Sequence, residues 1–117
     1  MPNHYHLFIY QLEDVQAITK LMRSLATAYS MYFNKKYKRV GPLFQQRYRA
    51  VRIVEDNQLL HVTRYIHLNP DDYRGYEWSS LAAYLGDYRA EWIMPGRVLQ
   101  LFEGDEYARF VDSYKDK

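Results

Sequence analysis

Apolar residues recur at three- and four-residue steps in two stretches of the chain, from Val15 to about Lys36 and from Asn57 to Leu68. On a helix this spacing gathers the apolar side chains on one face. Asp14 and Asp56 precede the two stretches and are suitable N-caps, while Pro70 cannot continue the second helix. The pattern therefore predicts two amphipathic helices. In the second helix, the stripe expected to pack against the core is Leu59, Val62 and Ile66.

Two other stretches are rich in residues that favour an extended backbone. His4 to Gln11 contains no glycine and is apolar on both faces beyond His6, which is typical of a central strand buried on both sides. Tyr48 to Val54 divides its side chains between two faces and predicts a second strand. Gly41 and Pro42 interrupt the chain between the first helix and this strand.

Beyond Pro70 the pattern changes to short helical pieces joined by turns. Residues 71–117 are therefore interpreted as a C-terminal helical extension of a core formed by residues 1–70. A chain of 117 residues is long enough for one modest hydrophobic core, so we expect residues 1–117 to form a single domain. The short helices predicted in the extension are Ser79 or Ser80 to Leu85, Val98 to Phe102 and Glu106 to Tyr114.

The composition excludes several classes of site. The sequence contains no cysteine, so disulfides and thiolate metal sites are excluded. Its longest apolar runs are far too short to cross a bilayer, so we expect no membrane partner. Because the sequence contains 13 tyrosines, only spacing and neighbouring residues can single out a chemically active one.

Positive charge is concentrated in one stretch, although the formal net charge is only +2. Between Lys35 and Arg52 there are seven basic residues and no acidic residue. A charge run is usually a solvated face, but here aromatic residues alternate with the charges. This combination offers phosphate contacts and stacking for unpaired bases. The residues expected to form such a surface are Lys35, Lys36, Lys38, Arg39, Arg47, Tyr48, Arg49 and Arg52.

Side chains with complementary chemistry occur at regular spacing near both ends of the predicted core. Alternation along a strand places His4 and His6 on one face, and a four-residue step along a helix places Tyr65 and Asn69 in one stripe. Two imidazoles, an amide and a phenol are the parts of a metal-assisted phosphotransfer site. The ordinary interpretations are polar residues at a strand start, a helix C-cap before proline and a tyrosine at the edge of the core.

Two further histidines lie on the second helix. His61 shares the stripe of Tyr65, where it either assists proton transfer or only forms a local hydrogen bond. His67 is two positions from Tyr65 and is expected to face elsewhere.

These residues resemble the motifs of a known family. Met1 to Leu7 is similar to the HUH motif (histidine, hydrophobic residue, histidine) of the small single-tyrosine transposases. Tyr65 to Pro70 resembles the tyrosine helix of one branch, the REP-associated tyrosine transposases, or RAYT proteins. The segments that resemble this branch elsewhere occur in the family's order: Tyr32 to Asn34, Gly41 to Gln45, Arg47 to Arg49 and Glu77 to Ser80.

The resemblance implies a fold and a reaction. The implied fold is α+β, with a ferredoxin-like or RRM-like antiparallel sheet and helices on its faces. Tyr65 would be the nucleophile that forms a 5′-phosphotyrosine bond with single-stranded DNA beside hairpin repeats and releases a 3′-hydroxyl. His4, His6 and Asn69 would hold a divalent cation, magnesium or manganese. The basic stretch would be part of the DNA surface.

The start of the chain departs from the family pattern. In the family a strand-helix-strand unit precedes the HUH strand, whereas this sequence begins with the motif itself. We therefore expect an N-terminally truncated sheet whose exposed strand edges either pair two copies as a homodimer or leave the chain weakly folded. The expected location is the bacterial cytoplasm, in association with the nucleoid.

Two other functions remain open from the sequence. One is a DNA-binding module of the same ancestry that binds hairpin or single-stranded DNA without cutting it. The other is a metal-dependent hydrolase that uses His4 and His6 without a covalent step.

Overall fold

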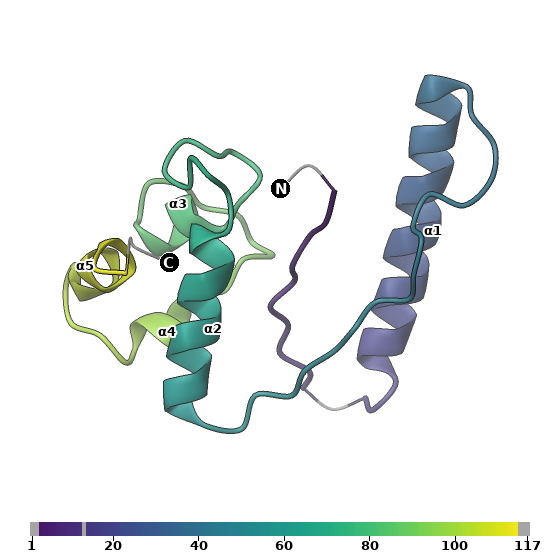
Figure 1. The fold of residues 1–117 in the computed structure, drawn as a ribbon. Helices are drawn as coiled ribbons and strands as arrows, with labels where there is room; N and C mark the ends of the chain where they lie inside the picture. Colours follow the sequence, from purple (N-terminus) through teal and green to yellow (C-terminus); the bar gives the residue numbers. More distant parts are fainter. Residues whose placement is uncertain (1–2, 13, 115–117) are drawn as a thin grey trace. The chain divides into compact units, whose positions relative to one another are not determined.

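The computed structural model describes residues 3–12 and 14–114, and α-helix is the only regular secondary structure in these residues (Figure 1). The two amphipathic helices predicted by the apolar spacing are confirmed, as are three short helices after residue 70, with ends displaced by a few residues. The helices are α1 (Ala17–Tyr37), α2 (Asp56–Leu68), α3 (Leu81–Tyr84), α4 (Gly96–Leu99) and α5 (Glu106–Asp112).

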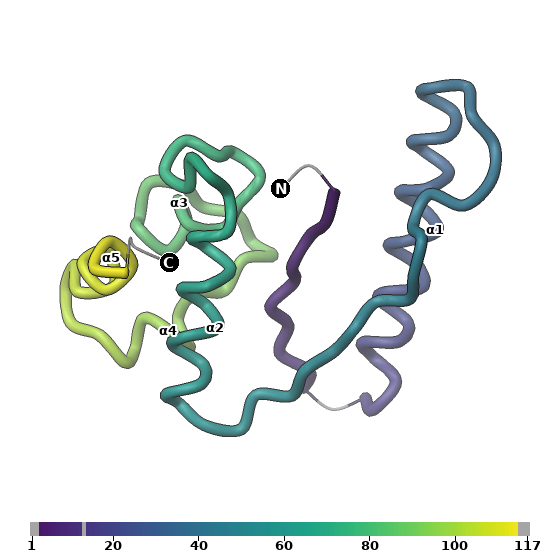
Figure 2. The backbone as a smooth tube through the Cα atoms, in the orientation of Figure 1, coloured from purple at the N-terminus to yellow at the C-terminus, as the bar shows by residue number. Residues whose placement is uncertain are grey.

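The predicted α+β fold with a ferredoxin-like or RRM-like antiparallel sheet is wrong, because the described residues contain no strand. Residues 4–12 and 47–54 do run extended, as the trace in Figure 2 shows, but neither joins a β-ladder. The expected burial of His4 to Gln11 on both sides is also wrong, since Leu7 and Tyr10 are exposed. β-Favouring residues select an extended backbone, whereas a strand also requires a neighbouring strand to exchange hydrogen bonds with it.

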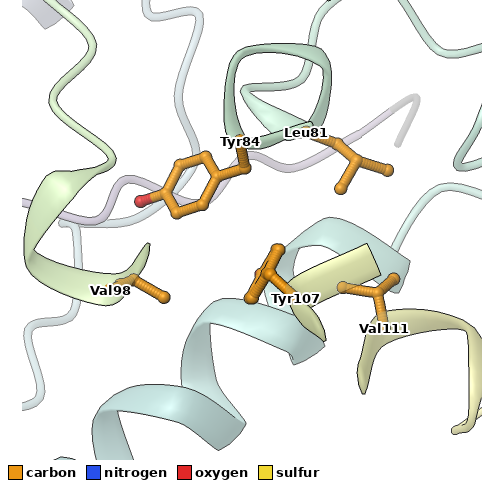
Figure 3. Close-up of a cluster of buried hydrophobic side chains, with 5 residues drawn as sticks. All are labelled: Leu81, Tyr84, Val98, Tyr107 and Val111. Atoms are coloured by element: carbon orange, nitrogen blue, oxygen red, sulfur yellow. The ribbon is translucent and has the colours of Figure 1, made fainter. Parts of the chain in front are cut away.

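The chain divides into two compact units. The larger unit comprises Met1–Leu7 and Ile53–Lys117 and contains α2 to α5, and the smaller unit comprises Phe8–Arg52 and contains α1. In the larger unit, buried side chains from α3, α4 and α5 form the core (Figure 3). Helix α2 packs on this core through Leu59, Leu60 and Leu68. The core residues are Leu81, Tyr84, Val98, Tyr107 and Val111.

The buried face of α2 is polar, which corrects the predicted stripe. Val62 and Ile66 are only half-buried, whereas Thr63, Arg64 and His67 are buried. Burial is tolerated because each of these three polar side chains has a hydrogen-bond partner within the larger unit. Apolar periodicity cannot reveal such a face, because it scores buried polar residues as exposed ones.

In the smaller unit the two ends of α1 are fixed by polar contacts. The predicted cap Asp14 lies two residues before the N-cap Gln16 and accepts a hydrogen bond from its backbone N–H at 2.8 Å. At the other end Lys38 adopts a left-handed conformation with φ of 52°, and the Arg39 N–H donates to the Asn34 carbonyl. The helix therefore ends in a tight turn ahead of Gly41.

Candidate active site

The structure brings His4, His6, Tyr65 and Asn69 together in the larger unit. His4 Nε2 lies 3.0 Å from Asn69 Oδ1, and the ring centroids of His4 and His6 are 5.3 Å apart. The His6 ring meets the Tyr65 ring edge to face, with centroids 5.6 Å apart. Side chains from the start and the middle of the sequence thus form one cluster around the C-terminal half of α2.

The cluster follows from a match between two backbone repeats. Two residues of extended chain advance about 6.6 Å, and four residues of helix advance about 6 Å. His4 and His6 therefore have the same spacing as Asn69 and Tyr65. Because the extended segment runs against the direction of α2, His4 faces Asn69 and His6 faces Tyr65.

His6 has an unused ligand atom. Its Nε2 is buried and has no hydrogen-bond partner among the described residues. Burial, and secondarily the neighbouring His4, lowers the pKa of His6 below its ordinary value, since both disfavour the imidazolium form. His6 is therefore a neutral imidazole at pH 7, which is the form that binds metals.

His4 lies between two amide oxygens. Its Nδ1 is 3.0 Å from Asn3 Oδ1, and its Nε2 is 3.0 Å from Asn69 Oδ1. A ring nitrogen that carries a proton can donate to the amide oxygen beside it. As a metal ligand, His4 would have to present Nε2 without a proton, because metal ligands must be deprotonated.

The separation of two of the candidate ligand atoms is compatible with a divalent cation. Adjacent ligands of an octahedral magnesium site lie about 3 Å apart, which is the separation of His4 Nε2 and Asn69 Oδ1. The described residues contain no group of three His, Cys, Asp or Glu side chains suited to a metal. A cation here would therefore depend on the Asn69 amide as its third protein ligand, beside His4 and His6.

Tyr65 is accessible to a large substrate. It is 56% exposed, although its ring edge packs on His6. Asn69 is the C-cap residue of α2, and its backbone N–H donates to the Ile66 carbonyl at 3.3 Å. The side-chain oxygen of Asn69 lies against His4 Nε2.

The other two histidines of α2 have different surroundings. His61 Nδ1 accepts a hydrogen bond from the Arg64 guanidinium at 3.1 Å, and its ring lies 6.0 Å from the Phe110 ring. His67 is buried, and both of its ring nitrogens lie 2.7 Å from hydroxyl oxygens, those of Tyr107 and Ser80. Sequence reasoning does not pair His67 with Ser80 or Tyr107, because both lie far from it along the chain.

The basic stretch belongs to the smaller unit. Lys36 Nζ lies 5.7 Å from the centre of the Tyr32 ring and 5.4 Å from that of Tyr37, so a basic side chain of this stretch lies beside two aromatic rings. Arg39 is half-buried and donates to Asn34 Oδ1 and to the Pro42 carbonyl, which gives it a structural role in the turn. The exposed members of the predicted surface are Lys35, Lys36, Lys38, Arg47, Tyr48, Arg49 and Arg52.

Comparison with known proteins identifies one family. Residues 1–69, which include the whole cluster, match the family described as Transposase IS200 like. The match covers more than half of the chain, and its first two residues, Met1 and Pro2, lie outside the described part of the structure. No curated protein and no solved structure matches the chain. Within residues 3–12 and 14–114, no helix has the length and apolar character needed to span a membrane.

Proposed function

The chain belongs to the IS200-like transposase family, and from this premise we propose that it is a metal-dependent single-tyrosine HUH endonuclease that cuts and rejoins single-stranded DNA. The observation that supports the proposal most directly is the cluster of His4, His6, Tyr65 and Asn69. The ordered RAYT-like motifs favour the REP-associated branch, with cleavage beside hairpin repeats.

Tyr65 is the proposed nucleophile. Its hydroxyl oxygen bonds to the scissile phosphorus while the bond from phosphorus to the 3′ oxygen breaks. The phenol proton passes to solvent, and the departing oxygen takes up a proton to become a 3′-hydroxyl. The product is a 5′-phosphotyrosine ester, which stores the energy of the phosphodiester, so a DNA 3′-hydroxyl can reverse the step without ATP.

His4, His6 and Asn69 are the proposed ligands of magnesium or manganese. When bound, the cation supplies Lewis-acid stabilisation of charge on the scissile phosphate. The neutral His6 ring contributes a lone pair from its partnerless Nε2, and its edge contact with Tyr65 limits the positions of the phenol. His61, one helical turn before Tyr65, is oriented by Arg64 and is proposed to assist proton transfer.

The exposed basic and aromatic residues of the smaller unit are the proposed DNA surface. Lys35, Lys36 and Arg49 supply charge for phosphates, and Tyr48 offers a face on which an unpaired base can stack. A cytoplasmic, nucleoid-associated location follows from this substrate and is part of the proposal.

We also propose a homodimer formed through the exposed edges of the extended segments 4–12 and 47–54.

The decisive experiment is covalent trapping of DNA on the protein. With manganese and a single-stranded oligonucleotide carrying a hairpin, wild-type protein should give a nick and an adduct that survives a denaturing gel. Tyr65→Phe should give neither but should still bind the hairpin, because only the hydroxyl is removed. Tyr88→Phe is the matched control, since Tyr88 is 57% exposed and lies outside the cluster.

The outcomes separate the proposal from its rivals. An adduct formed by Tyr65→Phe would disprove the assignment of the nucleophile. Hairpin binding by the wild-type protein without a nick would indicate a DNA-binding module, and nicking without an adduct would indicate a hydrolase. The double variant His4→Ala, His6→Ala should lose both DNA cleavage and the manganese binding that calorimetry detects. Its salt-sensitive DNA binding should persist.

A further inference from the structure

His67 is held by two hydrogen bonds on the side of α2 away from the cluster. Successive residues of an α-helix are rotated by about 100°, so His67 lies about 200° from both Tyr65 and Asn69. It is therefore on the opposite face, at the same level along the axis. Its side chain is 1% exposed and is buried in the larger unit.

The two partners of His67 come from different elements of the C-terminal region. Ser80 is the N-cap residue of α3, and Tyr107 lies in α5. Both hydroxyl oxygens lie 2.7 Å from a ring nitrogen, and hydroxyls can donate as well as accept, so a neutral imidazole satisfies both bonds. The Tyr84 ring packs edge to face on the imidazole, with centroids 4.6 Å apart.

Hydrogen bonds restrict the rotation of a helix about its own axis more tightly than apolar packing does. The leucines of α2 fix how deeply the helix sits on the core, yet they tolerate small rotations about its axis. Two short hydrogen bonds to separate elements do not tolerate such a rotation, because it would leave the imidazole and two hydroxyls buried without partners. One turn earlier on the same face, Arg64 donates to the Phe110 carbonyl at 3.0 Å and adds a second directional contact.

We propose that His67 is a positioning residue, which together with Ser80 and Tyr107 fixes the rotation of α2 and so places Tyr65 and Asn69 against His6 and His4. The inference rests on the proposed function, since it assigns the same cluster a mechanical support. Ser80 and Tyr107 lie beyond residue 69, where the family match ends, so the support comes from the C-terminal region of this chain.

The test removes single hydroxyl groups far from the reacting atoms. Tyr107→Phe and Ser80→Ala each delete one hydrogen bond to His67 with little change in packing, and the double variant deletes both. At saturating hairpin DNA, we expect each to slow adduct formation about tenfold, because small misplacements of reacting groups are costly in rate. Manganese affinity should fall about tenfold through Asn69, as for outer-shell partners of metal ligands. The KM for the hairpin should change less than about twofold.

A matched control distinguishes positioning from loss of stability. Val98→Ala creates a small cavity in the same core without removing a hydrogen bond, so it should lower the melting temperature and leave kcat and manganese affinity unchanged. All measurements are made well below the lowest melting temperature, with folding verified by circular dichroism. His67→Gln, which retains an amide able to reach one partner, should recover part of the activity that His67→Phe loses.

The outcomes distinguish failure of the positioning role from failure of the proposed function. Wild-type rates and manganese affinity in the folded double variant would overturn the positioning role and leave the proposed function intact. If the wild-type protein binds manganese but forms no adduct, the proposed function fails, and the manganese affinities of the variants still decide the positioning role. Absence of both manganese binding and adduct in the wild-type protein would overturn both.

Discussion

His6 and His67 are both kept neutral by burial, but their ring nitrogens have different surroundings. Both nitrogens of His67 contact hydroxyl groups, so the side chain is complete within the protein. His6 leaves Nε2 buried without a partner among the described residues, which is unfavourable unless a ligand completes it. This contrast supports the positioning role proposed for His67 and the metal-ligand role proposed for His6.

The pKa of His67 is lowered by burial to about 4, from an ordinary 6.5, so stability should depend on pH. Between pH 6.5 and 4, His67 is protonated in the unfolded chain and neutral in the folded chain. The free energy of unfolding should therefore fall by about 3 kcal/mol as the pH drops from 7 to 4, and this contribution should level off about one pH unit below 4. Urea unfolding at several pH values measures the slope.

Two variants identify the source of that slope. His67→Phe should be less stable at pH 7 but should lose most of the dependence between pH 6.5 and 4. His6→Gln is the control, because burial lowers the His6 pKa as well and adds a smaller loss in the same direction. An unchanged slope in His67→Phe would show that other groups control the acid sensitivity.

At the scale of elements, the sequence correctly predicts the helices and which residues meet in the cluster, whereas the sheet that it predicts does not form among the described residues. The apolar repeat of α1 and α2 is local, so it predicts them without knowledge of their neighbours. Strand pairing is not local, and the extended segments lack it. The convergence of His4 with Asn69 could be predicted from the resemblance to a family, whereas the partners of His67 could not, because Ser80 and Tyr107 follow no periodic signal.

The contact between α2 and α5 depends on a buried arginine. Arg64 is buried, with its guanidinium carbon 3.9 Å from the centre of the Phe110 ring and 4.1 Å from that of Tyr114. The described residues offer it no carboxylate, so stacking, the Phe110 carbonyl and His61 Nδ1 stabilise the charge. A planar guanidinium suits this slot, whereas the ammonium of lysine cannot stack between two rings.

We therefore predict that Arg64→Lys lowers the free energy of unfolding by about 1–3 kcal/mol, despite retention of the charge. Arg109→Lys is the matched control, because Arg109 forms an exposed ion pair with Asp105 and should change stability by less than about 0.5 kcal/mol. Urea unfolding measures the stability of both variants, and an unchanged m-value would show that a shifted midpoint reflects stability alone. Equal midpoints for the two variants would show that the stacked guanidinium adds nothing.

At the scale of the whole molecule, apolar burial is distributed unequally between the two units. The buried apolar residues of the described chain are five in the larger unit but only Met22 in the smaller one. The smaller unit instead exposes large apolar side chains, among them Leu12 at 78% and Val51 at 80%. Exposed apolar surface on extended segments is typical of protein interfaces and of sites of aggregation. Such surface is the basis for the proposed homodimer.

The corresponding prediction is that the chain self-associates as its concentration rises. Light scattering after size exclusion should show a shift from monomer to dimer, and Leu12→Lys combined with Val51→Lys should raise the dissociation constant at least about tenfold, because burial of these side chains would be lost. Gln45→Lys combined with Gln46→Lys is the control: it adds the same charge near the same segment but removes no apolar side chain. If the control weakens association equally, charge repulsion and not apolar burial is responsible. A wild-type chain that stays monomeric at every concentration would refute the homodimer.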